Sequence, residues 1–551
     1  MFIRVKTTPN SPRKSIQIVE SIRKGTKITQ KIVRHVGIAM DDSELIRLKE
    51  LAEFIKCKIE EERHPKLLKP EEIAKRVIKA KQEKKYQEKL MINIKNLREE
   101  QRSIVGIHEI YGKIYDEIGF KKVLKNPSRN KSSCEILKDI VLARIANPLS
   151  KMGSVEMLER DFGIGINLDS VYRMMDKIDK EAEENIQKTA YEHTKKMLSN
   201  KVNVVFVDAT TLYFESFESD RLRENGYSKD LKFKETQILF ALLVTEEGLP
   251  VGYQIFPGST YEGHTLVPIL QEIKTRYDLG KVIFVADSGL LNNDNLEALE
   301  DNGFEYIVGA RIKNVSKKLK EEILNKNNYK KIDDSDDLKI NRLKYKNRNL
   351  IISYSPKRAR KDTHERQKNI DRLLKKVQKR VGVKDLMGNY GYKKYINIES
   401  NEKLSIDEDK IKADQEWDGL HGVITNAKDM TDTQVLEYYH GLWQVEESFR
   451  INKHDLKVRP IFHFKPERIK AHMAISFMAF TCVRNLEYRI KLQYKKLSPE
   501  VIRRELLHVQ GSLIVDDSTK KQFYLPSKIS DTAKKIYKLM NVGYKTHAFP
   551  L

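Results

Sequence analysis

Residues 202–208 read Val-Asn-Val-Val-Phe-Val-Asp, an apolar run that ends in the carboxylate of Asp208. The same pattern returns at 282–287, where Val-Ile-Phe-Val-Ala precedes Asp287. Short runs rich in β-branched residues predict buried strands. An ionised carboxylate next to an apolar run costs free energy unless something compensates it. Each aspartate taken alone is also compatible with a simple turn or cap at a strand end.

The segments around these two runs predict an α/β core. Periodicity indicates further strands and helices, at 236–244, 250–256 and 306–308 for the strands and at 266–277 and 291–299 for the helices. The predicted order is three strands, helix, strand, helix, strand. This is the ribonuclease-H-like arrangement, in which the ends of two neighbouring strands meet at one edge of the sheet.

The rest of the chain divides by charge and periodicity. We expect seven parts: a strand-rich segment at 1–40, a charged helical linker at 41–104, a helical domain at 105–200, the first part of the core at 201–310, an inserted β-rich domain at 311–430, core-closing helices at 431–490 and a helical C-terminal region at 491–551.

The chain is strongly basic, with 103 Lys and Arg against 79 Asp and Glu and a formal net charge of +24. An excess of this size indicates a polyanionic partner, most simply nucleic acid. A Lys-rich composition inherited from a biased genome would give the same number. The excess is uneven, however, because residues 357–380 hold eleven basic and three acidic residues.

Cysteine usage and hydropathy favour a cytoplasmic protein. Cys57, Cys134 and Cys482 are far apart and odd in number, which argues against a disulfide framework or a zinc cluster. Charge interrupts the apolar start of the chain almost at once, so no signal peptide is expected. The apolar stretch at 471–483 is too short to span a bilayer.

A third carboxylate, Glu446, lies in a predicted helix. Val435, Tyr439, Leu442, Glu446, Phe449 and Lys453 share one face at helical spacing, while Glu447 lies about 100° further round on the wetter side. The stripe predicts that Glu446 is the acid driven inward. The alternative is a partly buried glutamate held by a neighbour such as Arg450.

Together the three acids supply hard oxygen ligands, which favour Mg²⁺ or Mn²⁺ over zinc. Two such ions roughly 3.5–4 Å apart would serve an in-line phosphodiester displacement. The histidines, His463 among them, are scattered and give no ligand set.

In these residues the chain resembles the DDE transposases of bacterial insertion sequences. Within them it is similar to the IS4-type group, and most of all to the IS1634 branch of that group. The resemblance is carried by Val-Asp208-Ala-Thr-Thr, Val-Ala-Asp287-Ser-Gly and Tyr439-x2-Leu442-x3-Glu446-x6-Lys453, and also by Gly226-Tyr-Ser-Lys229-Asp230 and Arg459-Pro-Ile-Phe-His463. The third motif is similar to the group's Y-R-E-K pattern, with Leu442 at the arginine position.

The resemblance implies a ribonuclease-H-like core with a β-rich insertion between Asp287 and Glu446. The spacing agrees, with 79 residues from Asp208 to Asp287 and 159 from Asp287 to Glu446. It implies that these three acids are catalytic and bind two divalent ions, Mg²⁺ or Mn²⁺. It also implies a set of DNA-binding residues: Tyr439 and Lys453, with Lys229 in a matching motif and Arg450 in place of the missing arginine.

Trp443 lies four residues after Tyr439 and is predicted either to stack on an unpaired base or to pack in the core. The leading hypothesis is a transposase that binds the terminal inverted repeats of its element, cleaves DNA and joins the freed ends to target DNA. A homodimer on double-stranded DNA, associated with the bacterial nucleoid, is then expected. A ribonuclease-H-like endonuclease without strand transfer and a domesticated DNA-binding protein are the alternatives.

Overall fold

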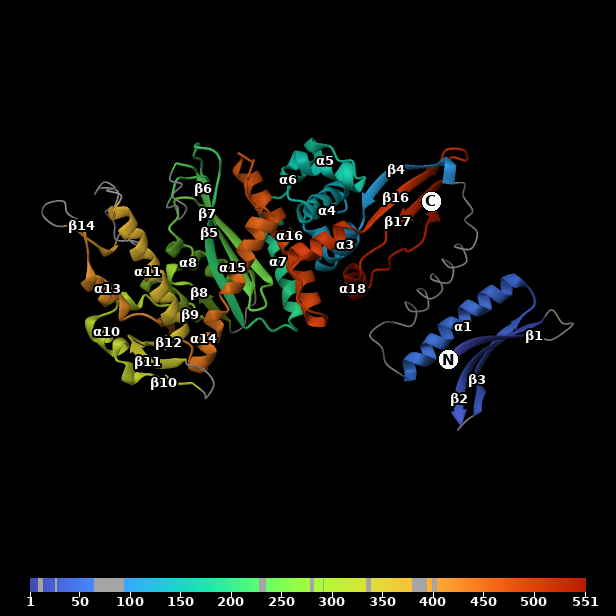
Figure 1. The fold of residues 1–551 in the computed structure, drawn as a ribbon. Coiled ribbons are helices and arrows are strands. Elements are labelled where there is room, and N and C mark those ends of the chain that lie inside the picture. Colours follow the sequence, from blue (N-terminus) through green and yellow to red (C-terminus); the bar gives the residue numbers. More distant parts are fainter. Residues whose placement is uncertain are drawn as a thin grey trace. The chain divides into compact units, whose positions relative to one another are not determined.

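The computed structural model of the chain describes residues 1–7, 13–24, 27–63, 94–226, 234–277, 282–290, 292–332, 338–378, 394–398 and 404–551. These residues fall into two units (Figure 1). The first is made of Met1–Arg102, Gly511–Lys528 and Lys545–Leu551, and the second of Ser103–Gln510 and Ile529–Tyr544.

Two small antiparallel sheets make up the first unit. One has the order β1-β2-β3 and carries a helix against it; its elements are β1 (Phe2–Thr7), β2 (Lys14–Lys24), β3 (Lys27–Ala39) and α1 (Asp42–Arg63). The other has the order β18-β17-β16-β4, formed by β4 (Leu97–Ile104), β16 (Gln510–Asp516), β17 (Gln522–Pro526) and β18 (Phe549–Pro550). The predicted strands near the N-terminus are present.

The second of these sheets corrects two sequence-based expectations. The end of the linker was expected to be helical, yet β4 is a strand, and the C-terminal region contributes three strands besides its helices. Both segments are highly charged and lie in the same sheet although more than 400 residues separate β4 from β16. Local periodicity cannot report a partner that is so remote in the sequence.

A nine-stranded sheet forms the centre of the second unit, in the order β10-β11-β12-β15-β9-β8-β5-β6-β7. Strand β5 pairs in parallel with β8, and β8 with β9, whereas β5, β6 and β7 are antiparallel to one another. The elements of this half follow the predicted order: β5 (Val204–Tyr213), β6 (Gln237–Thr245), β7 (Pro250–Pro257), α8 (Leu266–Arg276), β8 (Ile283–Ala286), α9 (Asn293–Asp301) and β9 (Glu305–Gly309). The mixed α/β class is confirmed.

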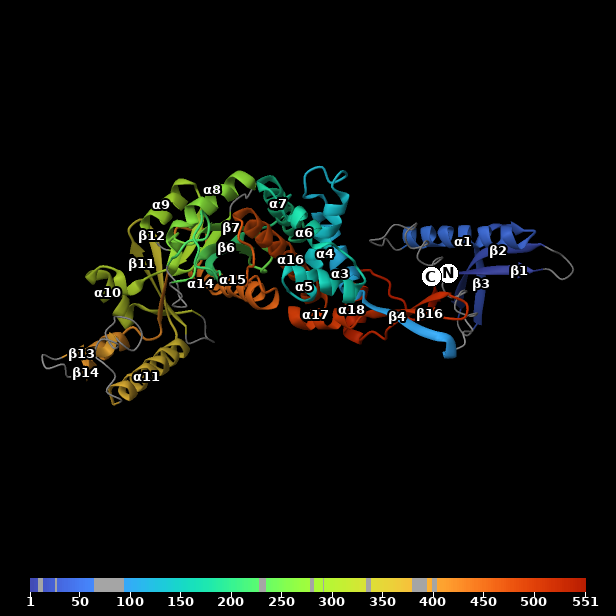
Figure 2. The same ribbon diagram turned by 90° about the horizontal axis from the view of Figure 1, so that it is seen from above.

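Helices cover both faces of this half of the sheet (Figure 2). Val207 and its alternate neighbours on β5 pack in one core with Ile269 of α8 and Leu299 of α9. Phe206 points the other way and packs in the core that holds Val435 and Phe449 of two later helices, α14 (Asp432–His440) and α15 (Trp443–Arg450). Successive strand residues face opposite sides, so β5 divides its side chains between these layers.

The region at 311–430 adds four strands to the same sheet. Strand β12 pairs with β15, and β15 pairs with β9 of the core. The elements between residues 311 and 430 are α10 (Lys317–Leu324), β10 (Lys330–Lys331), β11 (Lys339–Tyr345), β12 (Arg348–Tyr354), α11 (Pro356–Gln378), β13 (Ile396–Ile398), β14 (Leu404–Ile406), α13 (Glu408–Gln415) and β15 (Leu420–Thr425). The basic run at 357–380 is on α11, apart from its last two residues, which lie outside the described part.

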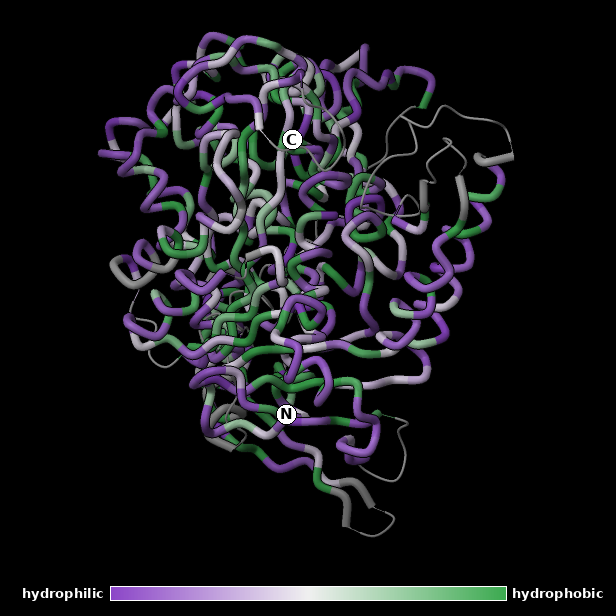
Figure 3. Tube along the Cα trace, turned by 90° about the vertical axis from the view of Figure 1, so that its left-hand side faces the viewer, coloured by the Kyte–Doolittle hydropathy of each residue, from purple (hydrophilic) through white to green (hydrophobic). Residues whose placement is uncertain are grey.

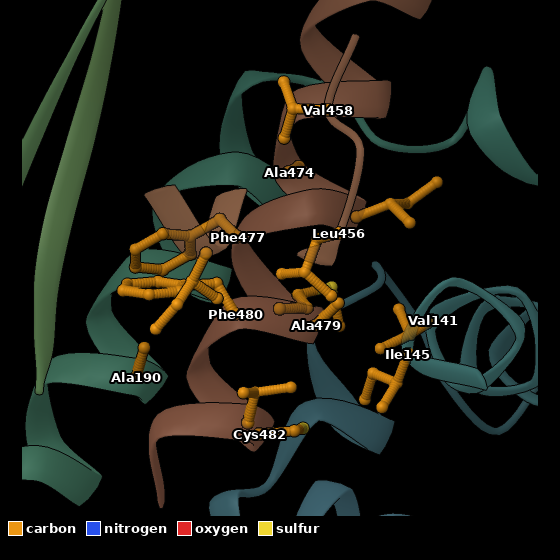
Figure 4. Close-up of a cluster of buried hydrophobic side chains, with 14 of the residues drawn as sticks. Val141, Ile145, Ala190, Leu456, Val458, Ala474, Phe477, Ala479, Phe480 and Cys482 are labelled. Carbon is orange, nitrogen blue, oxygen red and sulfur yellow. The ribbon is translucent and has the colours of Figure 1, made fainter. Parts of the chain in front are cut away.

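Residues 105–200 are helical in the structure, and their helices pack with three later ones in a bundle around the long buried helix α16 (Pro466–Gln493). The helices of this bundle are α3 (Gly106–Ile118), α4 (Lys131–Ala146), α5 (Lys151–Phe162), α6 (Leu168–Met175), α7 (Lys180–Met197), α16, α17 (Pro499–Leu507) and α18 (Asp531–Leu539). Phe477 and Phe480 of α16 lie near Ala190 of α7, and Val141 and Ile145 of α4 point toward α16 from another side (Figure 4). Seen from the side of α10 and α11, hydrophobic positions lie mainly toward the middle of the trace and hydrophilic positions mainly on its outside (Figure 3). None of the described helices is long and apolar enough to cross a membrane.

One buried acid in this bundle gives a pH-dependent prediction. Burial raises the pKa of Glu183 on α7 to about 7, and its Oε1 atom is buried without a hydrogen-bond partner. The folded protein keeps this carboxyl group protonated up to about pH 7, whereas the unfolded chain ionises it from about pH 4.5, so the free energy of unfolding falls between these two pH values and stays low above pH 7. Glu183→Gln is therefore expected to raise the free energy of unfolding by about 2 kcal/mol at pH 8 and by much less at pH 5. Urea unfolding at the two pH values measures this difference, and an equal effect at both would contradict it.

Candidate active site

The two aspartates are neighbours at the edge of the sheet where β8 ends. In the parallel pairing of β5 and β8, Val207 is opposite Ala286, so Asp208 and Asp287 each come directly after this last pair. Neighbouring strands lie about 4.8 Å apart. One detail differs from the prediction: β5 continues to Tyr213, so Asp208 lies within a strand. The reason is that β6 goes on pairing with β5 beyond the end of β8, with Leu242 opposite Asp208.

Both aspartates lie on the face of the sheet that α14 and α15 cover. Phe206 and Val285 are register partners and belong to the core on that side. Side chains two residues further along each strand return to the same face, which places Asp208 and Asp287 there. Asp208 is half-buried and Asp287 is exposed. Asp208 Oδ1 accepts a hydrogen bond from the backbone N–H of Ala209 at 2.8 Å.

Tyr439 of α14 lies over this edge. Its hydroxyl donates to Asp287 Oδ1 at 3.3 Å, and its ring packs against the imidazole of His421 in a tilted arrangement, with centroids 4.9 Å apart and ring planes at 41°. Gly309 ends β9 beneath it, where a Cβ would lie 2.4 Å from the Tyr439 hydroxyl oxygen. A glycine is therefore needed at the end of β9 for the phenol to reach Asp287.

The helix that carries Glu446 departs from the prediction. Helix α14 ends at His440, and α15 starts at Trp443 after a turn, so the predicted helix is interrupted. Helix α15 buries Val445 and Phe449 against β5 and β6, which turns Glu446 outward. The expectation that Glu446 is the inward acid is wrong.

Glu447 is the acid that points inward, with 14% of its side chain exposed. Its carboxylate lies 3.6 Å from Arg484 Nη1 and 3.5 Å from Lys496 Nζ. These cations compensate the burial of the charge, and helical spacing alone could not show them. Glu446 is exposed. Burial raises the pKa of Tyr439, the negative charge of Asp287 raises it further, and the charge of Glu446 makes a smaller contribution in the same direction.

Lys453 also belongs to this face. It lies in a π-helical turn, Ile451–Asp455, and its ammonium donates to Thr210 Oγ1 at 2.6 Å. Thr210 is two residues beyond Asp208 on β5, so the structure brings Lys453 to the side of the sheet that carries the acids.

The remaining residues predicted to bind DNA are Arg450, Trp443 and Lys229. Arg450 is exposed and its Nη2 lies 3.4 Å from Glu447 Oε1. Trp443 is 48% exposed, which argues against a core role, and Lys496 lies over its ring at 5.3 Å. Lys229 lies outside the described residues.

Sequence reasoning missed the residues that join this edge to the strands and helices at 311–430. A cavity of about 420 Å³ lies beside Ser288, lined among others by His421, Arg311 and Arg358. Burial and, after it, the positive charge of Arg358 lower the pKa of His421 to about 4. No local signal marks His421, because the pairing of β15 with β9 is what brings it to Tyr439. Arg358 was visible only as part of the basic run.

The carboxylates suit a hard divalent cation, although they do not form a closed cage. Within the described part of the chain, no three His, Cys, Asp or Glu side chains are grouped so that they could hold a metal ion. Asp208 and Asp287 nevertheless offer adjacent oxygen ligands on one open edge. Mg²⁺ commonly takes one or two protein carboxylates and completes its shell with water and substrate phosphate oxygens, so the donor set fits this ion or Mn²⁺.

The family follows from a domain match that contains all three acids. Residues 200–482, slightly more than half of the chain, match the family described as transposase DDE domain. The chain belongs to this family. DDE transposases are enzymes, and the family uses divalent metal ions. The match begins just before β5 and ends within α16, so it spans the whole edge described above.

Other comparisons give only distant likeness. No curated protein matches the chain. A piggyBac transposase synaptic complex with hairpin DNA is similar at 9% identity, over 73% of this chain and 76% of that chain, with a TM-score of 0.37. A Mos1 transposase paired-end complex with left transposon end is similar at 12% identity, over 46% and 75%, with a TM-score of 0.15. Membership of the DDE transposase family rests on the domain match.

The contact between Tyr439 and Asp287 leads to a prediction about this transposase. Tyr439→Phe keeps the ring but removes the hydroxyl that donates to Asp287. Loss of a hydrogen-bond partner of a metal ligand typically costs 10–100-fold in metal affinity or activity. With Asp287 as the metal ligand that we propose below, the Mg²⁺ concentration for half-maximal DNA cleavage is expected to rise by about that factor. Tyr438→Phe, at the next position and equally half-buried, is the control. An unchanged metal requirement in Tyr439→Phe would contradict the role.

Proposed function

We propose that this chain is the transposase of a bacterial insertion sequence of the IS4-type group, nearest its IS1634 branch. It binds the terminal inverted repeats of its element, cleaves DNA there and joins the freed ends to target DNA. The observation that carries this proposal is the register of β5 and β8, which puts Asp208 and Asp287 side by side on an open sheet edge, inside a DDE domain and a chain of net charge +24.

In this proposal Asp208, Asp287 and Glu446 hold Mg²⁺ or Mn²⁺, two ions in the working site. Ions held by these residues would supply the Lewis acidity that activates the attacking hydroxyl or water and stabilises the leaving oxygen of the phosphodiester. Tyr439 orients Asp287 through its hydroxyl. The ammonium of Lys453, held at Thr210 on the same face, binds a backbone phosphate next to the scissile bond.

Helix α15 must bring Glu446 to the edge. Glu446 is exposed on this helix, and in this proposal an approach of α15 toward the edge completes the ligand set once metal and DNA are bound. The order of strands and helices supports a ribonuclease-H-like core, in which a helix after the sheet supplies the third acid.

The partners follow from the chemistry. Double-stranded DNA is the substrate, both as inverted repeats and as target. Two ends must be held together before they are joined, so a homodimer in the DNA complex is proposed. The protein would then work in the bacterial cytoplasm, on the nucleoid.

A cleavage and joining assay tests the proposal. The full chain is incubated with Mg²⁺, a linear DNA that carries the sequences flanking its gene, and a supercoiled target plasmid. Nicks at the inverted repeats and end-joined plasmid products are expected. Cleavage without joined products would favour the endonuclease alternative, and specific binding without cleavage would favour a domesticated DNA-binding protein.

A further inference from the structure

Four basic side chains are buried together in the helical part of the second unit, apart from the acidic edge. They are Arg144 at the end of α4, Lys151 at the start of α5, His463 just before α16 and His472 within it, and each is less than a tenth exposed. The rings of His463 and His472 lie 5.5 Å apart. The family motif around Arg459 and His463 therefore ends in this basic cluster and not at the catalytic edge.

The cluster has no acidic partner among the described residues. Arg144 Nη1 donates to the carbonyls of Leu456 and Lys457 at 2.9 and 3.1 Å. His472 Nε2 lies 3.0 Å from the carbonyl oxygen of Val458, and its Nδ1 is buried without a partner. Lys151, only 5% exposed, makes no described hydrogen bond or ion pair.

Buried cations of one sign are costly unless an anion compensates them. Burial lowers the pKa of Lys151 well below its ordinary value, and the nearby charge of Arg144 lowers it further. Burial, followed by the charge of Lys151, lowers the pKa of His463 to about 3. At neutral pH His463 is therefore uncharged in the free protein, and an anion bound among these groups would raise their pKa values again and favour their protonated forms. Lys151 is also the first residue of α5, after the N-cap Ser150, and a helix N-terminus favours negative charge.

The surroundings point to a nucleic-acid strand as the source of that anion. The segment from Lys453 to His463 passes the end of β5: Lys453 contacts Thr210, and the guanidinium of Arg459 lies 5.1 Å from the ring centroid of Tyr213, the last residue of the strand. At about 3.3 Å per residue these two strand positions are roughly 10 Å apart. Phe462 and Phe464 are exposed on either side of His463, as aromatic platforms for bases or sugars are in single-strand binding sites.

We propose that Arg144, Lys151, His463 and His472 form a binding site for a backbone phosphate of the DNA strand that runs from the catalytic edge past Lys453 and Arg459. This inference rests on the proposed function, because the site would add one phosphate contact to the DNA that the transposase binds. It is a positioning site: it binds the strand away from the reacting atoms and sets the register of the DNA on the sheet.

Salt-dependent DNA binding tests this site with the full chain. Lys151→Met keeps the side-chain volume and removes the charge, and Lys151→Gln is a second variant in case the first perturbs the fold. Removing one phosphate contact is expected to reduce the slope of log K against log salt by about 1 and to weaken binding uniformly across DNA sequences. The control is Lys188→Met, an exposed lysine on α7 of the same bundle, which should retain the wild-type slope.

Thermal unfolding in phosphate and in chloride at equal ionic strength is an independent measurement of anion binding at this site. Phosphate should raise the melting temperature of the wild type and of Lys188→Met but not of the Lys151 variants. A phosphate-specific shift with an unchanged DNA slope would show a free-anion site and overturn the DNA assignment. No shift and no change in slope would overturn the site altogether. If the wild type does not bind DNA, the proposed function fails as well. If the wild type binds DNA and Lys151→Met binds it with the same affinity and salt slope, only the phosphate site is refuted.

Discussion

Asp208→Asn and Asp287→Asn are each expected to lower the rate of DNA cleavage by on the order of 10³-fold, equivalent to about 4 kcal/mol of transition-state stabilisation. Each change replaces a carboxylate, which the proposal makes a metal ligand, by a neutral amide at the edge where β8 ends. Asp287 is exposed and Asp208 half-buried, so neither side chain is part of the buried core. Folding should therefore be little affected.

The measurement is single-turnover nicking of end-containing DNA in Mg²⁺, with the melting temperature of each variant recorded beside it. Asp294→Asn, an exposed aspartate in the first turn of α9, is the matched control and should cleave at the wild-type rate. Glu446→Gln should behave like the two aspartate variants. Wild-type nicking by Asp208→Asn or Asp287→Asn would remove the basis of the proposed active site.

The largest loss of stability is expected from Arg484→Met. Arg484 is 4% exposed and its guanidinium joins three elements: it donates to the carbonyl of Gly248 at 2.7 Å, to Glu487 Oε2 at 2.6 Å and, at 3.6 Å, faces Glu447 of α15. Removing it leaves two buried carboxylates without their main cation. Breaking a buried pair in this way costs about 3–5 kcal/mol, and chemical unfolding of the variant should show a loss of that size.

Arg489→Met on the same helix is the control for Arg484→Met. Arg489 is a quarter exposed and its Nη1 lies 2.7 Å from Glu117, also partly exposed. Pairs of this kind contribute about 0–1 kcal/mol. If both variants lost the same free energy of unfolding, burial of the ion pairs around Arg484 would not strengthen their contribution to stability. Because Glu447 anchors α15, Arg484→Met should also slow cleavage by displacing the helix that carries Glu446.

The sequence by itself determined the strands and the position of the acids along them. The apolar runs before Asp208 and Asp287 are dense in β-branched residues, so local propensity and burial agree, and both runs are strands in the structure. The order of the elements from β5 to β9 followed for the same reason. The basic composition also indicated a polyanionic partner without any knowledge of the fold.

Only the tertiary structure decided which acid of the Glu446–Glu447 pair is buried. Helical periodicity assumed one uninterrupted helix, whereas the turn at Gly441 and the packing of Val445 and Phe449 on the sheet set the rotation of α15. Arg484, almost 40 residues further along, compensates the inward charge. The contact of Tyr439 with Asp287 and the buried basic cluster depend likewise on residues brought together from distant segments. Such contacts depend on packing and charge compensation between elements, which a local pattern does not encode.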